Sequence, residues 1–321
     1  MDFDQQLDLS GSREAIMRRT RFTQYAWGVL VYNLFVVLWG AVVRASGSGD
    51  GCGKHWPLCG GNLAPVFQRV ATMIEYSHRL SSGLVVPLVV ILFIWGYKAY
   101  PKGHPVRLGV ALAVLLTIIE AALGAGLVLL GLVGTNQSPA RFFMMSWHLI
   151  NTLLLLMSIS LTAWWSASGR PISFRGQGNI ALLLGVGLCA ALFLAVSGSI
   201  TALVDTLYPS TNLWAALRQD MAPTTHYMIR LRLLHPIIAI SVGIFTALMA
   251  SYVARTRPSS ETKRFARNVI AIFWIDVAAG FLNVWLLAPV GMQLLHLLLT
   301  DLLWINLVLL TAAALPKGFS D

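Results

Sequence analysis

Eight long apolar stretches constrain the fold of this chain more than any other feature of its sequence. Each is about 20 residues long or slightly longer, the length that an α-helix needs to cross a bilayer. A spanning segment has to be helical, because the bilayer interior offers the backbone no hydrogen-bond partners. We therefore predict an all-α, polytopic membrane protein with eight transmembrane helices. The predicted spans are residues 25–43, 74–97, 108–130, 142–165, 180–204, 231–253, 269–288 and 292–314.

The composition supports this fold class and excludes others. Hydrophobic residues make up 57% of the 321 residues and charged residues only 11%, about half the charged fraction of an average soluble protein. An ordinary soluble domain and a disordered chain are therefore excluded. The net charge of +10 does not predict nucleic-acid binding, because the basic residues lie in short loops beside apolar stretches.

The distribution of lysine and arginine predicts the orientation. Fifteen of these 23 residues lie in the polar tail 1–24, in the loops 98–107, 167–179 and 255–268, and in the tail 315–321. Loops rich in lysine and arginine stay in the cytoplasm, so we predict that both termini are cytoplasmic and that the protein lies in the cell membrane. The polar N-terminal tail also predicts that no signal peptide is removed.

The two halves of the sequence look like copies of one another, with glycines, histidines and acidic residues in the same order. The matched pairs are Gly40 with Gly198, His78 with His235, Glu120 with Asp276, Gly124 with Gly280, and His148 with His296. Each half has four spans, so the copies point the same way. We predict two pseudo-symmetric four-helix bundles, residues 25–166 and 180–314, joined by a cytoplasmic linker at 167–179.

Four histidines lie inside spans, one in each of the second, fourth, sixth and eighth. They are His78, His148, His235 and His296. All four spans enter from the non-cytoplasmic side, and a rise of about 1.5 Å per residue places the histidines at a similar depth. Two facing imidazoles in each bundle are what the axial ligation of a heme iron needs. The alternative is that each histidine bonds a neighbouring helix.

Acidic residues near or inside the spans are candidate functional groups. Glu75 and His78 are three residues apart and share a helix face, and a carboxylate at a bilayer rim is costly enough to suggest a function. The alternatives for Glu75 are a salt bridge to Arg79 and a solvated helix end. The acidic residues inside spans, Glu120, Asp276 and Asp301, predict polar contacts between helices or a proton path.

Arginines gather at the non-cytoplasmic level of the spans. Guanidinium groups bind carboxylates in a bidentate manner, so we predict that they pair with heme propionates. Contact with lipid headgroups is the alternative. The candidates are Arg44, Arg79, Arg141, Arg230 and Arg232.

The loop after the first span contains Cys52 and Cys59. Two cysteines seven residues apart in an oxidising compartment predict a disulfide bond. A metal site that includes His55 is the alternative. The third cysteine, Cys189, lies within an apolar stretch and is expected to act as a small hydrophobic residue.

These motifs resemble the heme A synthase family over nearly the whole chain. The resemblance is carried by Cys52 and Cys59 with the intervening Trp-Pro-Leu, by the Glu75-x-x-His78-Arg79 motif, and by the three further histidines of the spans. It implies an oxidoreductase that converts a methyl group of heme O, through a hydroxymethyl intermediate, into the formyl group of heme A.

The resemblance also implies a division of labour between the bundles. The C-terminal bundle would hold a resident heme b through His235 and His296. The N-terminal bundle would receive heme O between His78 and His148, with Glu75 as the catalytic residue at the methyl group.

The implied partners are heme O synthase as donor, a membrane electron carrier, and the assembly of a terminal oxidase as recipient. The resemblance leaves open whether the protein forms a homo-oligomer. Two competing functions use the same features. One is a diheme b-type cytochrome that takes electrons from quinol, with the four histidines as its ligands. The other is a transporter built from parallel repeats.

Overall fold

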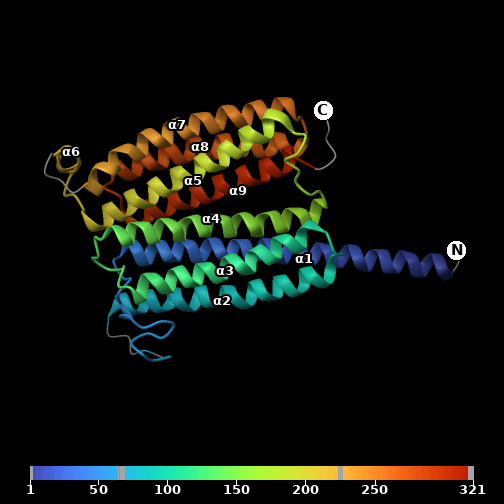
Figure 1. Cartoon of the computed structure of the whole chain (residues 1–321), viewed down its shortest axis with the longest axis horizontal. Coiled ribbons are helices and arrows are strands. Elements are labelled where there is room, and N and C mark those ends of the chain that lie inside the picture. Colours follow the sequence, from blue (N-terminus) through green and yellow to red (C-terminus); the bar gives the residue numbers. More distant parts are fainter. Residues whose placement is uncertain (1–2, 64, 66–68, 223–226, 317–321) are drawn as a thin grey trace.

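A computed structural model describes residues 3–63, 65, 69–222 and 227–316, and in these residues all of the regular elements are helices (Figure 1). The helices are α1 (Phe3–Ala45), α2 (Val70–Ala99), α3 (Pro105–Leu129), α4 (Pro139–Ser168), α5 (Gly178–Leu207), α6 (Leu213–Met221), α7 (Tyr227–Thr256), α8 (Ser260–Trp285) and α9 (Val290–Ala314). Eight of them, all except α6, are long and apolar enough to cross a membrane. The predicted all-α fold with eight membrane-spanning helices is confirmed.

Most helices extend beyond the predicted spans, most of all α1, which begins at Phe3 instead of residue 25, and α8, which begins at Ser260 instead of residue 269; only the third and seventh spans end early. The third ends at Leu129, one residue early, and the seventh ends at Trp285 instead of residue 288. Leu287 and Ala288 have φ values of 62° and 54°, a left-handed conformation that cannot continue a right-handed helix. They form the turn that leads into α9.

The spanning helices pack as two groups of four. In the first group α1 contacts α2 and α4, and α3 contacts the same two helices, so that α2 and α4 are diagonal to each other. In the second group α5 and α8 each contact α7 and α9, so that α7 and α9 are diagonal. The predicted twofold relation between the groups stays a prediction.

The groups meet along α4 and α9, which are the most deeply buried spans. Buried residues make up 44% of the apolar window of α4 and 56% of that of α9, against 33% or less in the other spans. Trp304 in α9 donates a hydrogen bond from its indole Nε1 to the carbonyl of Leu153 in α4, at 2.7 Å. This contact joins the two groups near the middle of both helices.

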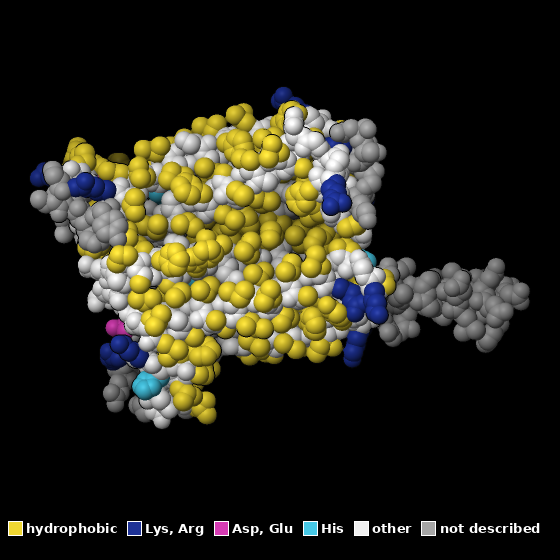
Figure 2. Space-filling model, in the orientation of Figure 1, with side chains coloured by type: hydrophobic (Ala, Val, Ile, Leu, Met, Phe, Trp, Pro, Cys, Tyr) yellow, Lys and Arg dark blue, Asp and Glu magenta, His cyan; other side chains and the backbone are white. Residues whose placement is uncertain are grey.

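The outer surface of the helices is apolar along its length. Figure 2 shows hydrophobic side chains over the whole flank, with basic side chains at the two ends. Residues such as Leu182, Phe193 and Trp274 are more than half exposed there. An apolar flank of this kind needs a nonpolar surrounding, so the structure is that of a multi-pass membrane protein.

The two ends of the molecule differ in their loops. The chain enters and leaves at one end, where the loops between α2 and α3, α4 and α5, and α7 and α8 also lie (Figure 1). The opposite end, here called the distal end, carries the loop from residue 46 to 63 and the short helix α6. The side chain of Asn212 caps α6 by accepting a hydrogen bond from Ala215 N at 2.8 Å. Helix α6 was not predicted, because it is too short and polar to span a membrane.

Candidate functional site

The C-terminal pair of histidines lies across the second group of helices. His235 is on α7 and His296 on α9, and their ring centroids are 6.4 Å apart. A metal–imidazole nitrogen bond is about 2 Å long, so two rings that share one iron have centroids roughly 6 Å apart, counting about 1 Å within each ring. The observed spacing agrees with a single iron between these two imidazoles.

The N-terminal pair occupies the corresponding diagonal of the first group. His78 is on α2 and His148 on α4, and the two imidazoles are close enough to interact electrostatically with each other and with Glu120. The structure therefore brings the four histidines together as two pairs, one pair in each group.

A glycine lies against the imidazole of each histidine. A Cβ atom would lie 3.0 Å from His78 Cε1 at Gly40, and 3.1 Å from His235 Cε1 at Gly198. At Gly280 it would lie 3.2 Å from His296 Cε1, whereas at Gly124 it would lie 3.6 Å from His148 Nε2, an ordinary van der Waals contact. A methyl group at the three shorter distances would push the rings, so those glycines make room for the imidazoles of His78, His235 and His296.

Carboxylates from the preceding helix contact the second histidine of each pair. Glu120 Oε1 lies 2.8 Å from His148 Nδ1, and Asp276 Oδ1 lies 2.7 Å from His296 Nδ1, without hydrogen-bond alignment. A carboxylate at Nδ1 orients the ring and leaves Nε2 free to bind a metal. Hydrogen bonds from threonine hydroxyls hold both carboxylates, from Thr152 to Glu120 and from Thr300 to Asp276.

Glu75 is buried, with 3% of its surface exposed, and its carboxylate is bound on both sides. Oε2 accepts a hydrogen bond from the backbone N–H of Cys52 at 2.7 Å, and Oε1 forms a salt bridge with Arg79. Of the two alternatives for Glu75, the salt bridge is present, and the burial of the side chain does not fit a solvated helix end. The contact with Cys52 was not predicted, because it joins a loop to a helix over 23 positions.

The disulfide bond between Cys52 and Cys59 is present, as predicted, and it closes the loop that covers Glu75. Arg79 fastens the same loop by donating hydrogen bonds to the carbonyls of His55 and Leu58. In the part of the chain that the structure describes, no cluster of three or more histidine, cysteine or acidic residues could hold a bare metal ion. The alternative metal site with His55 therefore has no support.

The five arginines predicted to bind propionates all have protein partners in the structure. Besides Arg79, Arg141 is 4% exposed and donates to the carbonyls of Gly134 and Asn136. Arg230 contacts the carbonyl of Ala222 at 3.5 Å. Any contact of these side chains with a propionate stays a prediction, and it would have to coexist with these bonds.

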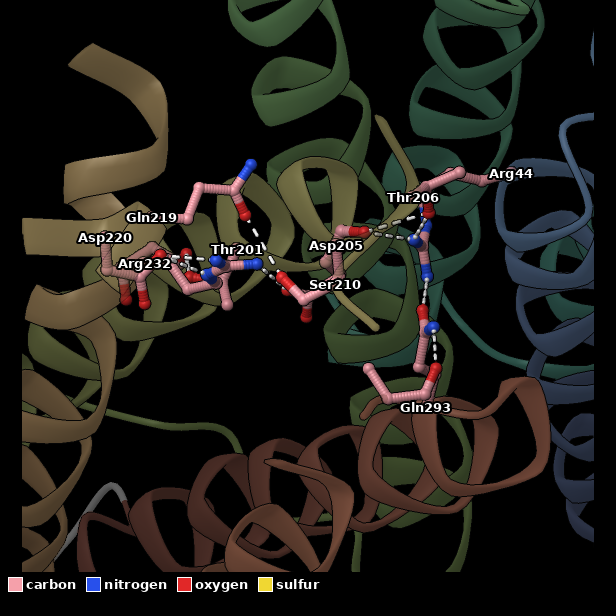
Figure 3. Close-up of polar contacts among 12 residues, drawn as sticks. Arg44, Thr201, Asp205, Thr206, Ser210, Gln219, Asp220, Arg232 and Gln293 are labelled. Carbon is pink, nitrogen blue, oxygen red and sulfur yellow. Dashed lines mark hydrogen bonds and ion pairs between the residues drawn. The ribbon is translucent and has the colours of Figure 1, made fainter. Parts of the chain in front are cut away.

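The other two arginines belong to a polar cluster at the distal end (Figure 3). Arg232 on α7 bonds Asp205 of α5 at 3.0 Å and Asp220 of α6. Arg44 of α1 donates to Thr206 of α5 at 2.9 Å and to Gln293 of α9, also at 2.9 Å. Arg232 therefore secures α6 to the second group, whereas Arg44 joins the two groups.

Asp301 lies within the span formed by α9. It is fully buried in α9, and neither carboxylate oxygen has a hydrogen-bond partner among the described residues. Its location agrees with the predicted place inside a span.

The residues present fit a heme in each group. Each histidine lies on a helix diagonal to its partner, against a glycine, and the His235–His296 spacing suits one iron. Two axial ligands are all that the protein must supply to a heme iron, because the porphyrin supplies the others. The lack of a larger ligand cluster therefore does not conflict with this fit.

Comparison with known proteins gives one family. The model of the cytochrome oxidase assembly proteins, COX15-CtaA, matches residues 23–308. A protein of Exiguobacterium sibiricum named heme A synthase is 30% identical over 252 residues, which cover 77% of this chain and 80% of that protein. A heme A synthase of Alkalihalophilus pseudofirmus is 45% identical over 98 residues, or 30% of this chain and 33% of that protein.

A longer relative carries a different name. A protein of Thermus thermophilus named protoheme IX farnesyltransferase is 46% identical over 299 residues, which are 93% of this chain but 49% of that protein. This chain thus spans about half the length of that relative. Because the family model covers most of the chain and the Exiguobacterium protein aligns over most of its own length, the chain belongs to the heme A synthase family of cytochrome oxidase assembly proteins.

Proposed function

We propose that this protein oxidises heme O to heme A, converting a methyl group into a formyl group through a hydroxymethyl intermediate. The observation that carries the proposal is the duplicated histidine pair, with each imidazole against a glycine and on a helix diagonal to its partner. The family membership supports the same activity.

In this proposal the C-terminal group holds a resident heme b through His235 and His296, and the N-terminal group receives heme O between His78 and His148. A difference between the two halves at the position of Glu75 supports this division. The matching position in the second half is Arg232, whose charge is already paired with Asp205 and Asp220. Only the first half has a carboxylate at this position, three residues before the first histidine of its pair.

A heme bound at the C-terminal pair supplies one-electron chemistry. The residues of this chain bind the hemes, orient the ligand rings and shield the site from water. Glu120 and Asp276 hold the rings of His148 and His296 with Nε2 free, and the loop closed by Cys52 and Cys59 covers the distal end near Glu75. A covered site keeps water from a reactive position.

Glu75 is the proposed catalytic residue at the methyl group. A carboxylate can take up a proton there or stabilise developing positive charge. Arg79 and the Cys52 N–H fix it in position, one helical turn before His78 on the same face. A fixed charge needs no reorganisation during the reaction, which is why a held carboxylate suits this role.

The relatives also support a source for the substrate. The Thermus protein is about twice as long as the aligned region and is named protoheme IX farnesyltransferase. We propose that a farnesyltransferase in the same membrane supplies heme O, that a membrane electron carrier accepts the electrons, and that a terminal oxidase receives heme A. The proposed membrane is the cell membrane, with both termini in the cytoplasm, because the basic loops lie at the end with the termini.

Pigment analysis tests the function. Membranes that contain this protein together with a heme O synthase should yield heme A or its alcohol precursor on extraction and chromatography, and membranes with the synthase alone should yield heme O. Purified protein that contains heme b alone, and membranes that produce no heme A, would instead support the diheme cytochrome. Protein without any heme would contradict both functions.

A further inference from the structure

The second ring nitrogen of each pocket histidine has a different environment, and three of the four have an oxygen nearby. His148 and His296 lie beside the carboxylates of Glu120 and Asp276, although the contact of His296 with Asp276 lacks hydrogen-bond alignment. His235 Nδ1 lies 2.9 Å from the hydroxyl of Ser197. His78 Nδ1 is buried and has no hydrogen-bond partner among the described residues.

The direction of the Ser197 hydrogen bond follows from its other contact. The hydroxyl of Ser197 donates its single hydrogen to the carbonyl of Leu194 at 2.7 Å, so toward His235 it can only accept. His235 therefore carries its hydrogen on Nδ1 and presents the lone pair of Nε2 to the pocket. This is the form in which an imidazole binds iron.

The difference between His235 and His78 comes from one residue in the preceding helix. Ser197 comes directly before Gly198, and Trp39 comes directly before Gly40. A Cβ atom added at either glycine would lie at nearly equal distances from its histidine, 3.1 and 3.0 Å from Cε1 and 3.7 and 3.8 Å from Nδ1. The tryptophan indole N–H instead donates to the hydroxyl of Ser77 at 3.0 Å.

We propose that this difference sets how tightly each of the two sites holds its heme. Ser197 makes His235 a firmly held ligand for a resident heme, and Trp39 leaves His78 as the ligand that releases its heme. The inference rests on the proposed function, because it explains why one site keeps its heme and the other exchanges it. An unbonded ring nitrogen leaves the imidazole less firmly oriented and a weaker donor to iron. A substrate site needs such release, whereas a cofactor site does not.

The test measures heme release from purified protein loaded with hemin, in the presence of an excess of apomyoglobin as acceptor. The wild type should lose heme in a fast and a slow phase. His148→Ala should remove the fast phase and His296→Ala the slow one, which assigns each phase to its site.

Two matched comparisons then isolate the hydroxyl group. Ser197→Ala should speed the slow phase by about fivefold, the factor that one hydrogen bond of about 1 kcal/mol supplies, and Ser197→Thr should keep the wild-type rate. Trp39→Ser should slow the fast phase by about fivefold relative to Trp39→Ala, because both remove the indole and only serine adds a hydroxyl.

Equal rates in either comparison would overturn the inference. An unchanged slow phase in both Trp39 variants shows that they remain folded, so that a difference between their fast phases supports the inference. A wild type that binds two hemes with release rates insensitive to these changes would refute the inference alone. A wild type that binds no heme would refute the proposed function and the inference with it.

Discussion

The sharpest test of the catalytic proposal is Glu75→Gln. The side chains of Glu75 and Arg79 are only 4% and 9% exposed, so the substitution leaves a buried guanidinium without its counter-charge. Removing one partner of such a pair costs about 3–5 kcal/mol. Glutamine still offers one oxygen to the Cys52 N–H. Some loss of stability is therefore expected whether or not Glu75 takes part in catalysis.

The catalytic contribution can be separated from this structural cost. A charge held against a developing opposite charge contributes roughly a hundredfold or more in rate, so we expect Glu75→Gln to produce at least about a hundredfold less heme A. Heme bound at the C-terminal pair should be retained, because Glu75 has no contact with His235 or His296. Pigment extraction from membranes that also contain heme O synthase measures both quantities.

The control is the double variant Glu75→Gln with Arg79→Met. It removes the unpaired buried charge, and replacing both partners of a buried pair is often neutral, so the thermal unfolding midpoint should return toward that of the wild type. Heme A should stay absent if the carboxylate is catalytic. Near-normal heme A in the double variant would refute the reasoning and leave Glu75 as a residue that anchors the loop.

Three further predictions concern topology, heme binding and the loop. In a Cys189→Ala background, an impermeant thiol reagent added to whole cells should label a cysteine at Arg218 but not one at Lys102; the reverse pattern would refute the orientation. His235→Ala should abolish the low-spin heme spectrum of the resident heme, since the iron loses an axial ligand, and an unaltered spectrum would refute this assignment. Cys52→Ser should loosen the loop over Glu75 and lower heme A yield, while the resident heme stays bound; equal yields of heme A would show that the disulfide has no role in activity.

Much of the architecture was predictable because it depends on local properties of the chain. Span length and hydropathy are read from about 20 consecutive residues, and all eight spanning helices were found in this way. Errors remained at the ends, as at Leu287 and Ala288, where a turn conformation overrides apolar character. The polar nine-residue helix α6 gave no such signal.

The histidines were also accessible to sequence reasoning, because the duplication repeats them with their glycines. Their pairing across diagonal helices then follows from the contacts of each group. The residue before each glycine was a signal that could have been read: serine at Ser197 and tryptophan at Trp39 differ in what they can offer a neighbouring imidazole.

By itself, the sequence determined the fold class, the eight spans, the candidate heme-ligating histidines and the disulfide bond. Hydropathy, the internal repeat and a short cysteine spacing can all be read directly along the chain. Only the tertiary structure decided the partners of the charged side chains. Arg44 bonds Gln293, 249 positions away, and Glu75 accepts from the backbone of a distant loop. A buried charge takes whichever partner the packing of helices brings within about 3 Å, and no local pattern encodes that proximity.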